Sequence, residues 1–216
     1  MLNSGYVDQL VYRGTTTVGL VCADGVVLAT DTRVTMPRSF IAHRKGKKVH
    51  KIDDHLGITI SGVVADAQNV VDTLRYHAGI YKLEKRDVIP VRAIARMASN
   101  VFFSSRLFPY IADVLIGGYD KMGPSIFNVD FFGSITKENY VSTGSGSPIA
   151  YGILESEYRE GLTIEDGMAI AVKAVTSAMK RDAMSGDSFD VVKIDKDGYL
   201  EISEEEKKRV LTKVLG

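Results

Sequence analysis

The apolar residues change their spacing several times along the chain, and the order of these changes constrains the fold more than any other feature. Alternating or continuous apolar segments predict strands, whereas apolar residues at every third or fourth position predict helices. The order is strands, two helices, strands, two helices, a strand and a short terminal helix. The predicted strands are residues 15–23, 26–30, 48–52, 56–61, 113–119, 125–130, 138–143 and 189–194, and the predicted helices begin near Asp66, Pro90, Pro148, Thr163 and Ser203.

The first predicted hairpin is apolar on both of its faces. Its two strands, residues 15–23 and 26–30, meet at Asp24-Gly25, a typical tight-turn sequence. A strand that is apolar on both sides is covered on both sides. The sequence therefore predicts one α+β domain, in which helices pack on stacked antiparallel sheets.

Composition excludes several classes of protein. Lysine plus arginine equals aspartate plus glutamate at 27 each, so no net charge favours nucleic acid or an anionic membrane as a partner. No run approaches the roughly 18 apolar residues of a membrane span. Cys22 is the only cysteine, and residues 1–14 lack a secretory pattern, so we expect a cytoplasmic protein.

Metal, thiol and nucleotide chemistry are not indicated by any motif. The four histidines have no metal-ligand spacing, so we expect no metal and no cofactor. Cys22 is expected to be a buried, inert thiol, and Gly46-Lys47-Lys48 lacks the upstream glycine of a P-loop. His77 is expected in the core or at its boundary, and His43, His50 and His55 are expected at the surface.

Gly14-Thr15 is the first feature that suggests catalysis. If the bond between them were cut, Thr15 would carry a hydroxyl nucleophile and a free α-amine, whose ordinary pKa of about 7.7–8.0 suits a base near neutral pH. The alternative is that Thr15-Thr16-Thr17 only starts a strand, because threonine favours strands.

Polar residues at strand ends accompany this threonine. Asp31 ends one predicted strand, Lys48 opens another and Ser61-Gly62 ends a third; Gly144-Ser145-Gly146-Ser147 and Arg181-Asp182-Ala183-Met184-Ser185-Gly186 adjoin helices. These motifs, with Thr15-Thr16-Thr17-Val18-Gly19, Asp31-Thr32-Arg33 and Lys47-Lys48-Val49, occur in the order found in proteasome β subunits. From Thr15 to the final helix the chain resembles that family, and most of all its archaeal type.

The resemblance implies a fold, a reaction and a set of site residues. It implies the N-terminal nucleophile hydrolase fold, a four-layer αββα sandwich over residues 15–216. The implied reaction is hydrolysis of peptide bonds in unfolded proteins by a threonine-type endopeptidase. The implied site residues are Thr15 as nucleophile and amine base, Asp31, Lys48 rather than its neighbour Lys47, Gly62 as oxyanion N–H donor, and Ser145, Asp182 and Ser185 around the amine, with Arg33 as structural support.

The resemblance also gives residues 1–14 a role. They would form a propeptide that Thr15 removes by autocatalytic attack on the carbonyl of Gly14, and the chain written from Met1 would be the precursor. Val34, Ile60 and Val64 would line the substrate pocket and favour hydrophobic side chains. The implied partners are identical subunits in seven-membered β rings, proteasome α subunits and a regulatory ATPase.

Two other functions stay open. A non-catalytic ring subunit would share the fold and need no threonine, acid and lysine together, and an amidase of the same hydrolase class would act on small molecules. Peptidase assays on rings with this chain as their only β component would distinguish them.

Overall fold

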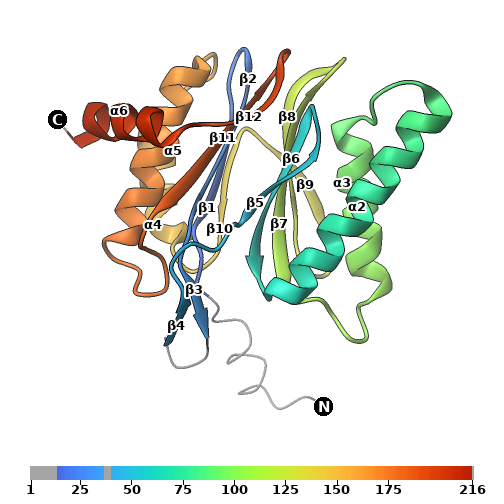
Figure 1. Ribbon diagram of the computed structural model, residues 1–216, viewed down its shortest axis with the longest axis horizontal. Helices are drawn as coiled ribbons and strands as arrows, with labels where there is room; N and C mark the ends of the chain where they lie inside the picture. The colour runs from blue at the N-terminus through green and yellow to red at the C-terminus, as the bar shows by residue number, and fades with distance from the viewer. Residues whose placement is uncertain (1–13, 37–39, 216) are drawn as a thin grey trace.

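A computed structural model describes residues 14–36 and 40–215 of the chain (Figure 1). Of the predicted propeptide, residues 1–14, it describes only Gly14, so the rest of that segment lies outside the described residues.

The first sheet holds five antiparallel strands in the order β10-β1-β2-β11-β12. The β1–β2 hairpin turns at Asp24, as the sequence predicts, and every residue of β2 is buried. Full burial follows from the apolar residues on both faces of this strand. The strands are β1 Thr17–Val21, β2 Gly25–Asp31, β10 Tyr140–Thr143, β11 Phe189–Asp195 and β12 Gly198–Glu201.

The second sheet also holds five antiparallel strands, in the order β5-β6-β7-β8-β9. A separate two-stranded hairpin, β3 with β4, lies between β2 and β5 in the sequence. The strands are β3 Val34–Met36, β4 Phe40–His43, β5 Val49–Asp53, β6 Leu56–Gly62, β7 Ala112–Asp120, β8 Gly123–Val129 and β9 Ile135–Glu138.

Helices cover the outer face of each sheet (Figure 1). The Thr163 hydroxyl accepts the N–H of Asp166, and the Ser203 hydroxyl accepts that of Glu206, so these side chains cap the helices that the sequence predicts to begin there. Helices α2 and α3 lie on the second sheet, and α4 and α5 lie on the first. The helices are α2 Val64–Lys85, α3 Val91–Ser104, α4 Ser147–Glu157, α5 Ile164–Met179 and α6 Glu204–Leu215.

Three apolar cores hold the four layers together. One lies between α2, α3 and the second sheet, and includes Leu74 and Phe102. Another lies between α4, α5 and the first sheet, and includes Val175. The third lies between the two sheets, with Leu28 opposite Leu115. The predicted α+β fold and its αββα layering are confirmed.

Two local predictions are wrong. Residues 138–143 were expected to form one strand, but β9 ends at Glu138 and β10 begins at Tyr140, in different sheets. The chain crosses between sheets at Asn139, whose carbonyl accepts the N–H of Val21. His55 was expected at the surface; it is buried, and its Nε2 lies 2.8 Å from the carbonyl oxygen of Ile89.

Candidate active site

Thr15 lies two residues before the start of β1 and is buried. Its hydroxyl donates a 2.6 Å hydrogen bond to the carbonyl oxygen of Gly14, the preceding residue. Its backbone N–H points to the hydroxyl of Ser145 at 3.3 Å, and its own carbonyl accepts the N–H of Gly146 at 3.3 Å. The hydroxyl is therefore held against the peptide bond that joins Thr15 to Gly14.

Asp31 and Lys48 form a buried ion pair beside this threonine. Asp31 ends β2, and Lys48 immediately precedes β5 in the other sheet. The Nζ of Lys48 lies 2.8 Å from Oδ1 of Asp31, and their side chains are 9% and 0% exposed. Burial lowers the pKa of the Lys48 ammonium, while the carboxylate of Asp31 opposes that shift and favours the charged form.

The backbone around Asp31 holds its carboxylate in one orientation. Oδ1 accepts the N–H of Thr16 at 2.8 Å, in addition to the bond from Lys48. Oδ2 accepts the N–H of Arg33 at 3.1 Å and that of Gly186 at 3.0 Å. Four donors thus satisfy a fully buried carboxylate, which offsets the large cost of its desolvation.

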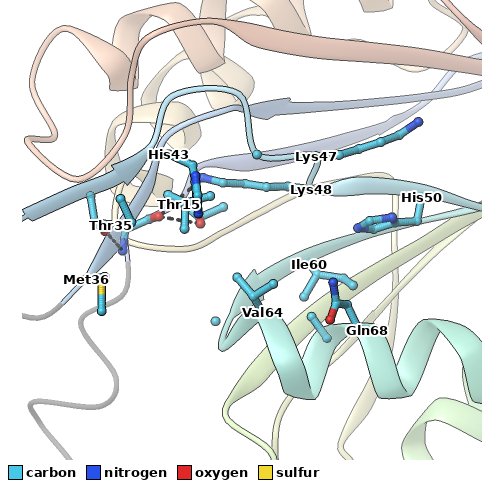
Figure 2. A pocket seen from close by; sticks show the side chains of 16 residues that line it. Thr15, Thr35, Met36, His43, Lys47, Lys48, His50, Ile60, Val64 and Gln68 are labelled. Atoms are coloured by element: carbon cyan, nitrogen blue, oxygen red, sulfur yellow. Dashed lines mark hydrogen bonds between the residues drawn. The ribbon is translucent and has the colours of Figure 1, made fainter.

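The two neighbouring lysines have different environments. The Nζ of Lys48 lies 3.4 Å from the carbonyl oxygen of Gly14, next to the hydroxyl of Thr15. Lys47 is exposed and pairs with Glu201 on β12. Figure 2 shows the Lys48 side chain pointing toward Thr15 and that of Lys47 pointing away. Because adjacent residues of an extended segment point in opposite directions, only Lys48 of the two reaches Thr15 and Asp31.

The carboxylate of Asp182 accepts hydrogen bonds from two hydroxyls near Thr15. Its Oδ2 accepts hydrogen bonds of 2.6 Å from both Ser145 and Ser185. Since Ser185 donates its proton to Asp182, the hydroxyl of Thr16 is the donor in their 2.7 Å contact. This chain of bonds connects the loop after α5 to the segment Thr15-Thr16, and Ser145 also accepts the N–H of Thr15.

The guanidinium of Arg33 donates hydrogen bonds to the same loop, after α5. Its Nε donates to Oδ2 of Asp187 at 2.8 Å, and its Nη1 donates to the carbonyl of Ala183 at 2.9 Å. The hydrogen bond from Arg33 holds the pKa of the Asp187 carboxyl below its usual range. Arg33 contacts this loop and not Thr15, in keeping with the predicted supporting position.

Two glycines near the site pack closely against neighbouring backbone. Gly62 ends β6 with φ at +134°, and a Cβ there would lie 2.1 Å from the carbonyl oxygen of Ile111. Gly144 has φ at +92°, and a Cβ there would lie 2.1 Å from the carbonyl oxygen of Thr15. Both the conformation and the space therefore require glycine at these positions.

A cavity of about 510 Å³ opens beside Thr15 (Figure 2). All three residues predicted to line a substrate pocket, Val34, Ile60 and Val64, line this cavity, together with Gly62 and Lys48. The structure therefore brings together the threonine, its lysine and the aliphatic wall. The remaining lining residues are Gly14, Thr35, Met36, Ala42, His43, Gly46, Lys47, His50, Ala67 and Gln68.

Sequence reasoning missed the polar part of this wall. His50 on β5 and Gln68 on α2 also line the cavity (Figure 2). Burial lowers the pKa of the His50 imidazole, and the positive charges of Arg75 and Lys47 lower it further. The sequence signal for His50 was its spacing of two residues from Lys48, which puts both side chains on one face of the strand.

No metal-binding cluster is present in residues 14–36 and 40–215: no three His, Cys, Asp or Glu side chains gather there in a way that could hold an ion. Within the same residues, no helix is both long enough and apolar enough to cross a membrane.

Comparison with known proteins decides the family. Residues 11–194 match the family described as Proteasome subunit. The chain belongs to the proteasome subunit family. Proteasome relatives match it almost end to end: Proteasome subunit beta 2 of Nitrosopumilus maritimus is 49% identical over 96% of this chain and 99% of the relative.

Two further proteasome relatives extend this likeness. Proteasome subunit beta of Archaeoglobus profundus is 49% identical, over 96% of this chain and 97% of the relative. Proteasome subunit beta of Methanocaldococcus vulcanius is 47% identical, over 94% of this chain and 90% of the relative. The predicted resemblance to an archaeal-type proteasome β subunit is confirmed.

Proposed function

We propose that this proteasome β subunit is a threonine-type endopeptidase that activates itself by cutting the Gly14–Thr15 bond. The observation that carries the proposal is the position of the Thr15 hydroxyl. It lies 2.6 Å from the carbonyl oxygen of Gly14, beside the buried Lys48–Asp31 pair and at the mouth of a cavity. A scaffold subunit would have no need of this arrangement.

Self-cleavage follows from these contacts. Oγ1 of Thr15 attacks the carbonyl carbon of Gly14, and the carbonyl oxygen becomes an oxyanion near Nζ of Lys48, now 3.4 Å away. The C–N bond breaks, the nitrogen takes up the proton lost by the hydroxyl, and an ester joins Gly14 to Oγ1. Water then hydrolyses the ester and releases residues 1–14 with a new carboxyl group.

Turnover of substrates uses the amine that cleavage exposes. While Thr15 is bonded to Gly14 its nitrogen is an amide and cannot accept a proton. Once free, the amine lies beside the hydroxyl of Ser145, and it takes the proton of Oγ1 as the hydroxyl attacks a substrate carbonyl. The charge of Lys48 lowers the pKa of that hydroxyl and of the amine, which favours the attacking form.

The surrounding residues have supporting roles in this proposal. Asp31 holds Lys48 and offsets its burial. Asp182 orients Ser145 and Ser185 through two short hydrogen bonds, and so fixes the surroundings of the amine. The N–H of Gly62, at the edge of the cavity, stabilises the oxyanion formed from substrate, a contribution of about 100–1,000-fold in rate for such donors.

The cavity would bind the side chain before the bond to be cut. Val34, Ile60 and Val64 give it an aliphatic wall, which favours hydrophobic and aromatic side chains. The His50 imidazole is neutral near pH 7 because burial and nearby positive charges lower its pKa. A pocket of this kind selects against an added positive charge, which Lys47 and Lys48 would repel.

The function also requires assembly. We infer that the chain forms seven-membered β rings with copies of itself, stacked against α subunits, and that a regulatory ATPase feeds unfolded proteins to the enclosed threonines. High coverage of relatives named proteasome subunit beta supports this proposal. The cytoplasmic location stays a prediction from the sequence.

Mass spectrometry of the assembled particle tests the proposal directly. The intact mass and N-terminal sequencing should show a chain that begins at Thr15. Thr15→Ala should fold, assemble, keep residues 1–14 and hydrolyse no peptide, whereas Thr15→Ser keeps a hydroxyl and should retain both reactions. A particle that hydrolyses peptides with residues 1–14 still attached would refute the mechanism. Normal turnover by Thr15→Ala would remove Thr15 from the nucleophile role.

A further inference from the structure

Three buried hydroxyls connect the two sheets next to the active site. Thr143, the last residue of β10, lies 2.7 Å from Thr17 on β1 and 3.0 Å from Ser61 on β6, measured between side-chain oxygens. All three residues are less than 9% exposed. Ser61 also reaches the carbonyl oxygen of Asp113 at 3.4 Å. One direction of donation satisfies every contact: Thr17 to Thr143, Thr143 to Ser61, and Ser61 to Asp113.

This hydroxyl chain differs from the rest of the space between the sheets. Elsewhere that space is filled by aliphatic side chains such as Leu28, Leu115 and Ile194. Among the described residues, the Ser61–Thr143 bond is the only side-chain hydrogen bond whose two partners both lie within strands of different sheets. Lys47 and Lys48 also reach the first sheet, but both precede β5. Apolar packing is non-directional. A hydrogen bond between the sheets instead fixes their relative position in both distance and direction.

Each member of the chain adjoins a segment of the site. Thr17 is two residues after the nucleophile Thr15, and Ser61 immediately precedes Gly62 at the edge of the cavity. Thr143 immediately precedes Gly144, whose backbone packs against the carbonyl of Thr15. The three segments that surround the reacting atoms are thus joined through one threonine hydroxyl, although none of these three side chains lines the cavity.

We propose that Thr143 is a positioning residue, whose hydroxyl holds the Thr15 segment at a fixed distance from the strand that carries Gly62. This inference rests on the proposed peptidase function. Attack by Oγ1 needs the substrate carbonyl between the nucleophile on one sheet and the oxyanion donor on the other. A misplacement of about 1 Å between such groups can cost about 100-fold in rate. Loss of the link should therefore lower kcat and leave substrate binding nearly intact.

Kinetics of assembled particles test this role. Thr143→Val keeps the branched shape and removes the hydroxyl; we expect kcat for peptide hydrolysis to fall about 10- to 100-fold, with KM changed less than about twofold. Thr143→Ser keeps the hydroxyl and should restore kcat to within about threefold. Thr176→Val is the matched control, because the Thr176 hydroxyl bonds only within its own helix, and it should leave both constants unchanged.

A second variant keeps the proposal falsifiable if Thr143→Val does not assemble. Ser61→Ala breaks the link from the other side and should lower kcat in the same way. Combining the two substitutions should cost less than the sum of the two single changes, because both remove the shared Ser61–Thr143 bond. Assembled particles of either variant with normal kcat and only a lower melting temperature would overturn the positioning role. Wild-type particles without peptidase activity would instead refute the proposed function itself, and this inference with it.

Discussion

Asp31→Asn is the substitution whose effect the structure constrains most sharply. The carboxylate is fully buried and accepts four hydrogen bonds, from Nζ of Lys48 and from three backbone N–H groups. Asparagine has nearly the same shape, so packing is retained. Its amide nitrogen, however, is a hydrogen-bond donor, and it would take the place of a carboxylate oxygen that accepts two hydrogen bonds in the wild type. The substitution also removes the negative charge that compensates the buried ammonium of Lys48.

The expected loss of stability follows from this uncompensated charge. Removing one partner of a buried ion pair costs about 3–5 kcal/mol, because the other charge stays buried without a counterion. For a chain of this size, each kcal/mol corresponds to roughly 2–4 °C in melting temperature. Asp31→Asn should therefore lower the melting temperature by roughly 6–20 °C. Peptide hydrolysis should fall as well, because Lys48 loses its anchor.

Differential scanning calorimetry measures this change on the precursor. Both proteins would carry Thr15→Ala, so that processing of residues 1–14 does not differ between them. Asp54→Asn is the matched control: Asp54 pairs with Lys51, but its side chain is 72% exposed. Exposed pairs of this kind contribute little, so the melting temperature of the control should barely change.

The pH dependence gives the test a direction as well as a size. Burial lowers the pKa of Lys48 in the folded protein below its ordinary value near 10.5. Between the two values the unfolded chain binds more protons, so stability rises with pH in that window. Without Asp31 the folded pKa is lower still, and the window widens. The deficit of Asp31→Asn should thus shrink as pH rises toward 10.5, and a deficit that grows with pH would refute the reasoning.

Three further substitutions test other parts of the structure. Gly62→Ala should lower both the melting temperature and peptidase activity, because a Cβ meets the carbonyl of Ile111 at 2.1 Å and strained backbone of this kind costs about 1–3 kcal/mol. In the proposed pocket, the His50 imidazole would form one hydrogen bond with the hydroxyl of a bound tyrosine, which phenylalanine lacks. A hydrogen bond contributes about 1 kcal/mol, so His50→Leu should reduce the preference for tyrosine over phenylalanine before the scissile bond, measured as a ratio of kcat/KM values, about fivefold. Burial raises the pKa of the Cys22 thiol to about 12. Between about pH 9 and 12 the thiol is therefore deprotonated in the unfolded chain but protonated in the folded one, and the free energy of unfolding falls as pH rises. Cys22→Ala should make this fall less steep in denaturant titrations at several pH values.

Each of these predictions has a contradicting result. Wild-type melting behaviour of Gly62→Ala would show that the backbone at this turn relaxes freely. An unchanged tyrosine-to-phenylalanine ratio in His50→Leu would mean that the imidazole does not reach the bound side chain. If Cys22→Ala loses stability with pH as steeply as wild type, other groups cause the alkaline limb.

The sequence by itself determined the order of most elements and pointed to the residues that the fold brings together around Thr15. Hairpins, helix caps and amphipathic stripes are set by neighbours a few positions apart, so they are readable without the fold. The threonine at position 15 and the motifs around Asp31 and Ser145 identified the family for the same reason. Adjacent strand residues point to opposite sides, so the sequence indicated that only one of Lys47 and Lys48 can reach Thr15. The structure decided that this residue is Lys48.

Only the tertiary structure decided which strands share a sheet and which distant side chains meet. Residues 138–143 have uniform strand character, yet the chain changes sheets at Asn139, because pairing depends on partners far away in the sequence. The burial of His55, the place of Gln68 in the cavity wall and the contact of Thr143 with Ser61 are likewise properties of packed layers. Local periodicity carries no information on contacts between segments 80 residues apart, since burial and hydrogen bonding there are fixed only when the two sheets close on each other.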